Sequence, residues 1–75
     1  MKKANLFCPR EVVFVDGRMT YSPTVPGLNT PLSGSMLEIE VNILEVEGDQ
    51  AIVLLPEILR YDQEETATVG VHHLN

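Results

Sequence analysis

The chain has 75 residues, of which 44% are hydrophobic and 21% charged, and its formal net charge is −6. A chain of this length forms one domain, residues 1–75, and buries only roughly 60% of the surface that its unfolded form exposes. Cys8 is the single cysteine, which excludes an intramolecular disulfide and leaves a metal or association as the usual sources of extra stability. The apolar run after Lys2 and Lys3 is too short for a signal peptide or a membrane span, which predicts a cytoplasmic location without membrane contact.

The charge is divided unevenly between the two halves of the chain. Residues 1–35 carry four basic and two acidic side chains, a net charge of +2, whereas residues 36–75 carry Arg60 and nine acids, a net charge of −8. An acidic half of this kind repels nucleic acid and anionic membranes. The charge pattern therefore favours a protein partner with a basic surface and makes nucleic acid an unfavourable one.

A first hairpin is predicted near the N-terminus. Residues 11–15 are rich in β-branched and aromatic side chains, and Asp16 and Gly17 separate them from a second extended segment at 18–22. Asp-Gly suits a type I′ turn, because both central residues of that turn need a positive φ.

Residues 23–35 contain three prolines and two glycines, which remove ladder donors and favour turns. We expect an irregular loop there. Three of its side chains are apolar, namely Val25, Leu28 and Leu32. Apolar residues in a solvated loop indicate contact with another molecule, so these three are predicted to contact neighbouring copies.

A long hairpin is predicted from Met36 to Leu55. Residues 37–43 alternate between apolar and polar side chains, and the phase then slips, which predicts a β-bulge near Ile43 and Leu44. The turn falls at residues 47–50, placing Val46 opposite Ala51 and Leu44 opposite Val53. Residues 51–55 have no polar side chain, so the return strand should be central and covered on both faces.

The C-terminal part is predicted to hold one helical turn and one strand. Pro56 suits the first position of a short turn over residues 56–61. Residues 66–74 read as a strand, in which His72 and His73 would point to opposite faces and could not bind one ion together. Together the elements predict a mainly β fold: a small SH3-like or OB-like partly open barrel of about five short strands with one short helical turn near residues 56–61. A β-sandwich formed by dimerisation would give a similar pattern within one chain.

No residue pattern indicates catalysis. Cys8 has one basic neighbour, Arg10, which is weak support for a reactive thiol. The serines of the loop have no histidine in a recognisable order, and the glycines are not spaced as in phosphate-binding loops. Alternate glutamates on a strand are typical of a solvated sheet face. We therefore expect a protein that is not an enzyme, with no metal and no cofactor.

The leading functional hypothesis is a non-catalytic interaction or inhibitor module that docks an acidic sheet face on a basic partner surface. Such a layout suits inhibitors encoded by phages or mobile elements. The predicted partner-binding residues are Glu38, Glu40, Glu45, Glu47 and Asp49. The alternatives are a structural or assembly subunit of a homo-oligomer or larger complex, and a small nucleic-acid-binding barrel that uses Arg10, Arg18 and Tyr21.

Overall fold

The computed structural model of the chain describes residues 2–28, 31–32, 37–60 and 64–75. In this part of the chain lie six strands: β1 (Lys2–Phe7), β2 (Arg10–Val15), β3 (Arg18–Pro23), β4 (Glu38–Glu47), β5 (Gln50–Leu54) and β6 (Thr66–Gly70). Two 3₁₀ turns follow the last strands, η1 (Glu57–Leu59) and η2 (Val71–His73). The prediction of a small, mainly β domain is confirmed.

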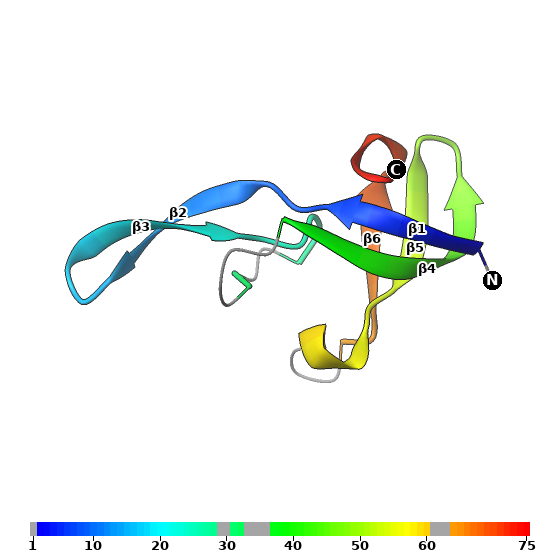
Figure 1. The fold of residues 1–75 in the computed structure, drawn as a ribbon. Helices are drawn as coiled ribbons and strands as arrows, with labels where there is room; N and C mark the ends of the chain where they lie inside the picture. The colour runs from blue at the N-terminus through cyan, green and yellow to red at the C-terminus, as the bar shows by residue number, and fades with distance from the viewer. Residues whose placement is uncertain (1, 29–30, 33–36, 61–63) are drawn as a thin grey trace.

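The strands form two antiparallel sheets. Four strands in the order β1-β4-β5-β6 make the main sheet, and β2 and β3 form a separate two-stranded hairpin that projects away from it (Figure 1). We call the main sheet with its covering loop the body and the β2–β3 hairpin the arm. Over the described residues these sheets do not close into a barrel, so the SH3-like or OB-like barrel type stays a prediction.

The C-terminal residues lie beside β1 of the main sheet. The Asn75 backbone N–H donates to the Asn5 carbonyl at 2.8 Å, and the Asn5 N–H donates to the Asn75 carbonyl at 3.1 Å. This pair of bonds flanks an isolated bridge between Leu6 and Leu74, so the last residues cover the outer edge of β1.

The arm follows the turn chemistry of its sequence. Its turn residues Asp16 and Gly17 have φ values of 52° and 74°, as a type I′ turn requires. Six residue pairs join the strands, from Arg10 opposite Pro23 to Val15 opposite Arg18. At about 3.4 Å per residue the arm reaches roughly 20 Å from its base, about half of the longest dimension of the molecule, 41 Å.

The long β4–β5 hairpin confirms the predicted bulge. The register shifts between Ile43 and Glu45, and beyond it Val46 pairs with Ala51 as expected. The expected pairing of Leu44 with Val53 is wrong, because Leu44 is the inserted residue and Val53 pairs with Ile43.

The return strand β5 is central, as predicted, but it is not covered on both faces. Ala51 and Val53 point inward and are buried, whereas Ile52 and Leu54 on the outer face are only partly buried. Among the described residues, that face therefore has no complete second layer over it.

The inner face of the sheet is covered by the irregular segment after the arm. Val25 and Leu32 from this segment and Leu59 from η1 join the buried side chains of β1, β4, β5 and β6 in one hydrophobic core. Gly27 allows the segment to lie against β6, since its φ is 91° and a Cβ there would collide with the Thr68 carbonyl oxygen. The predicted loop at 23–35 is thus a covering layer over its described residues, while residues 29–30 and 33–35 lie outside them.

The C-terminal prediction is confirmed in one place and wrong in another. The 3₁₀ turn η1 lies within the helical turn expected at 56–61, of which Tyr61 is outside the described residues. The strand expected over 66–74 ends at Gly70 and is followed by η2. A 3₁₀ turn places successive side chains about 120° apart, so His72 and His73 do not point to opposite faces, and their ring centroids lie 4.1 Å apart.

Candidate functional site

All four predicted partner-binding glutamates lie on the outer face of β4. Glu38 and Glu40 alternate with the buried Ile39 and Val41, and both are exposed. Beyond the bulge, Glu45 pairs with the outward-facing Ile52, so Glu45 and Glu47 return to the same face. The inserted Leu44 therefore keeps all four carboxylates on one side of the sheet.

Asp49 is exposed at the turn between β4 and β5, beyond the end of this row. We call Glu38, Glu40, Glu45 and Glu47 the acidic row. Lys3 of β1 lies beside it and forms an ion pair with Glu40 at 3.6 Å, with both side chains mostly exposed. Such an exposed pair contributes little to stability and leaves three carboxylates of the row without an ion pair among the described residues.

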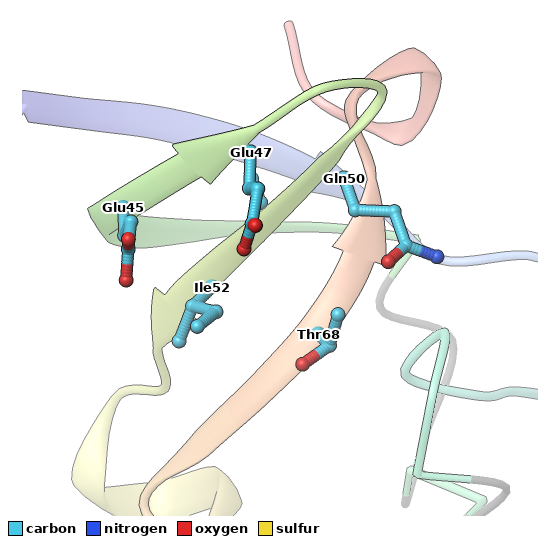
Figure 2. A pocket seen from close by; sticks show the side chains of 6 residues that line it. Glu45, Glu47, Gln50, Ile52 and Thr68 are labelled. Carbon is cyan, nitrogen blue, oxygen red and sulfur yellow. The ribbon is translucent and has the colours of Figure 1, made fainter.

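A shallow pocket of about 230 Å³ lies at the far end of the acidic row. Glu45 and Glu47 stand over the outer face of β5 and β6, with Gln50, Ile52 and Thr68 beside them (Figure 2). Pockets for small organic ligands are typically larger, about 300–1,000 Å³. Two carboxylates, an amide and a hydroxyl beside one aliphatic side chain are suited to accept hydrogen bonds from a single lysine or arginine side chain.

The arm carries an apolar surface that the sequence analysis did not identify. Val12 lies opposite Tyr21 and Phe14 opposite Met19, and residues directly opposite each other in an antiparallel pair share one face. Their exposed fractions are 48% for Val12, 65% for Tyr21, 76% for Phe14 and 62% for Met19. We call these four residues the apolar arm face.

The sequence held a signal for this face, because a two-residue turn fixes which residues lie opposite each other. The sequence does not indicate that this face is exposed, because the same pattern is typical of a strand with one face buried in a core. The other face of the arm is more polar, with Glu11, Thr20 and Ser22 among its side chains.

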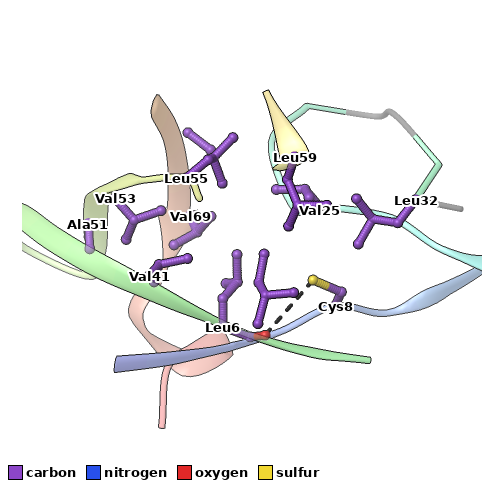
Figure 3. Close-up of a cluster of buried hydrophobic side chains, with 12 residues drawn as sticks. Leu6, Cys8, Val25, Leu32, Val41, Ala51, Val53, Leu55, Leu59 and Val69 are labelled. Carbon is purple, nitrogen blue, oxygen red and sulfur yellow. Dashed lines mark hydrogen bonds between the residues drawn. The ribbon is translucent and has the colours of Figure 1, made fainter. Parts of the chain in front are cut away.

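The loop residues predicted to contact other copies lie in the protein's own core. Val25 and Leu32 are buried beside Cys8 and Leu59 (Figure 3), and Leu28 is partly buried against the same cluster. Their apolar character is explained by packing within one chain. The observation that motivated a contact role for Val25, Leu28 and Leu32 therefore no longer applies, and the apolar arm face provides the exposed apolar surface instead.

Cys8 is placed as a core residue. Its side chain is fully buried, and its Sγ donates a long hydrogen bond of 3.9 Å to the Leu6 carbonyl oxygen (Figure 3). Burial raises the pKa of the Cys8 thiol by desolvating the thiolate. A nucleophilic cysteine needs the opposite shift and access to its substrate.

Two other kinds of site are not seen in the described part of the chain. No group of three or more histidine, cysteine, aspartate and glutamate side chains is arranged there to hold a metal ion. No helix in these segments is long and apolar enough to cross a membrane.

Comparison of the chain with protein-family models, with curated proteins and with solved structures finds no match. Function is therefore inferred from two surfaces of the molecule, the apolar arm face and the acidic row.

Proposed function

We propose that the protein is a non-catalytic structural subunit that assembles with copies of itself through the apolar arm face. The observation that carries this proposal is the exposure of Val12, Phe14, Met19 and Tyr21 on one side of a projecting hairpin. A two-stranded hairpin is only marginally stable in water by itself, and a partner that covers one face removes this weakness. Contiguous apolar patches on a protein surface commonly mark an interface.

The exposed area supports a weak to moderate association. At roughly 150–250 Å² for each aromatic side chain, Phe14 and Tyr21 together expose on the order of 300 Å² per copy. Val12 and Met19 add to this area. Stable interfaces bury about 800 Å² per partner, so contact through the arm alone should dissociate on dilution.

The charge of the arm also favours self-association. Residues 10–23 carry Arg10, Arg18, Glu11 and Asp16 and have no net charge, whereas the whole chain has a net charge of −6. Two copies repel each other when their acidic bodies approach. The arm holds the contact away from the bodies, because it projects from the main sheet (Figure 1).

Sedimentation velocity over a hundredfold range of protein concentration tests this proposal. We expect the average mass to rise with concentration, and Phe14→Ser to raise the concentration needed at least tenfold, since truncating a buried aromatic anchor commonly costs 2 kcal/mol or more. The matched control is Val15→Ser, which removes an exposed apolar side chain from the opposite face of the same strand. A monomer at every concentration would contradict the proposal.

A second candidate function is the docking of the acidic row on a basic partner protein. The bulge that places Glu38, Glu40, Glu45 and Glu47 on one face favours it, and so does the pocket beside Glu45 and Glu47. We expect Glu45→Lys with Glu47→Lys to abolish salt-sensitive capture of a basic partner. The control, Glu57→Lys with Glu64→Lys, changes the net charge equally at exposed positions elsewhere. Equal effects of the two pairs would indicate general charge attraction and exclude a specific face.

A further inference from the structure

The apolar arm face has charges of opposite sign at its two ends. Arg10 alternates with Val12 and Phe14 along β2, so it lies on the same face, at the base of the arm. Asp16 occupies the turn at the tip, six residues further along the chain. A positive charge thus precedes the apolar side chains and a negative charge follows them.

We infer that the occupant of the apolar arm face is the same face of a second copy, with the two arms stacked antiparallel about a two-fold axis. This inference rests on the proposed self-assembly and adds its geometry. With the arms antiparallel, the base of each arm lies over the tip of the other, so Arg10 approaches Asp16 of the partner subunit. The two-fold symmetry makes this contact twice.

A parallel stack of the same faces would be electrostatically unfavourable. It would bring Arg10 near Arg10 of the partner subunit and Asp16 near Asp16 of the partner subunit. Like charges held close together across an interface cost free energy, so the arrangement of charges selects the antiparallel stack.

The apolar side chains also fit an antiparallel stack. The two-fold axis passes midway along the face, between the Val12–Tyr21 pair and the Phe14–Met19 pair. Each Val12–Tyr21 pair then lies over Phe14–Met19 of the partner subunit. In this contact the small Val12 faces the aromatic ring of Phe14 of the partner subunit. The large ring of Tyr21 faces the flexible Met19 of the partner subunit, so large and small or flexible side chains can interdigitate.

The other surfaces of a second copy fit the apolar arm face less well. The outer sheet face presents the acidic row, which would repel Asp16 at the tip. The inner sheet face is already covered by Val25, Leu32 and Leu59 in its own core. Of these three surfaces in the described part of the chain, an identical arm is the one that combines matching apolar area with opposite charges in the right order.

A charge-exchange experiment tests the antiparallel stack. In a chain with Arg10→Glu, two acidic groups face each other at both contacts, and in a chain with Asp16→Lys, two basic groups do so. We expect each variant to dimerise at least roughly tenfold more weakly than the wild type. Mixed in equal amounts, the two variants should form heterodimers close to wild-type affinity, because both contacts then join opposite charges.

Native mass spectrometry of the mixture, with one chain isotopically labelled, distinguishes heterodimers from the two homodimers. Circular dichroism checks that each variant is folded, since a lysine at the positive φ of position 16 strains the turn. Asp16→Asn keeps the turn chemistry, and its mixture with Arg10→Glu should still favour heterodimers over Arg10→Glu homodimers.

The outcomes separate this inference from the function on which it rests. Loss of self-association in Phe14→Ser but not in Val15→Ser, together with a random mixture of homodimers and heterodimers, would leave arm-mediated assembly standing and overturn the antiparallel stack. Assemblies larger than a dimer that depend on Phe14 would overturn it as well, because a two-fold contact closes at two copies. A wild-type chain that stays monomeric would overturn both.

Discussion

The two hairpins of this protein share their local design and differ in their surroundings. The arm and the β4–β5 hairpin are both antiparallel, and both turn through two residues that include a glycine at positive φ, Gly17 and Gly48. In the arm Val12 lies opposite Tyr21, and in the β4–β5 hairpin Val53 lies opposite Ile43. Yet Val53 of β5 is fully buried, whereas Val12 of β2 is 48% exposed.

The difference lies in what packs on each hairpin. The strands β4 and β5 are flanked by β1 and β6, and their inner face is covered by residues such as Val25 and Leu59. The arm forms a sheet of its own (Figure 1). The apolar side chains on one of its faces are exposed to solvent. Hairpin formation is thus a local property of this sequence, while burial depends on segments far away in the chain.

A matched pair of substitutions should separate the two hairpins most clearly. Val53→Ala removes two buried carbons and leaves a cavity, so we expect the free energy of unfolding to fall by about 2 kcal/mol. Val12→Ala makes the same chemical change on an exposed strand and should alter the stability of the monomer by less than about 0.5 kcal/mol. Urea unfolding at a concentration below that of self-association measures both.

The same pair can contradict the comparison. A loss of about 2 kcal/mol for Val12→Ala in dilute solution would mean that the arm packs against its own body in the monomer. At high concentration, where the proposed dimer forms, we expect Val12→Ala to lower the free energy of unfolding by more than it does in dilute solution. The loss caused by Val53→Ala should be the same at both concentrations. This concentration dependence links the stability of the arm to its partner.

Local rules account for what could be predicted from the sequence. Asp16 and Gly17 determine a turn through the backbone conformations that they tolerate, and the phase slip at Leu44 determines a bulge because strand side chains alternate with a period of two. The shared face of Glu38 and Glu40 follows from the same period, and Glu45 and Glu47 join it through the bulge. These features depend on neighbours within a few residues.

Long-range contacts account for what could not be predicted. The partial exposure of Ile52 depends on whether a second layer covers the outer face, and the burial of Val25 depends on the path of its segment across the inner face. The turn at His72 forms where the Val71 N–H donates to the Asp49 carbonyl at 2.9 Å and the chain returns to β1. The apolar arm face was missed for the same reason, because the pattern of Phe14 and Met19 does not reveal that no layer covers them.

Thiol accessibility offers a finer comparison between body and arm. Cys8 is fully buried, so the folded protein should react with a maleimide many times more slowly than the chain unfolded in urea. A Met19→Cys variant places a second thiol on the exposed arm, where it should react at once in the monomer. Equal rates for the two thiols would show that the core around Cys8 opens readily.

The raised pKa of Cys8 makes the stability of the body depend on pH. Burial holds this thiol protonated in the folded state at pH values where the thiol of the unfolded chain has ionised. The unfolded state then binds fewer protons, so this contribution to stability is fully present below the ordinary pKa of a thiol and declines as the pH rises above it. We expect the urea midpoint of the wild type to fall more between neutral and alkaline pH than that of Cys8→Ala, whose other titrating groups are the same. A difference between the two proteins that stays constant with pH would mean that the thiolate is accommodated in the folded core, which its complete burial beside Leu6 opposes.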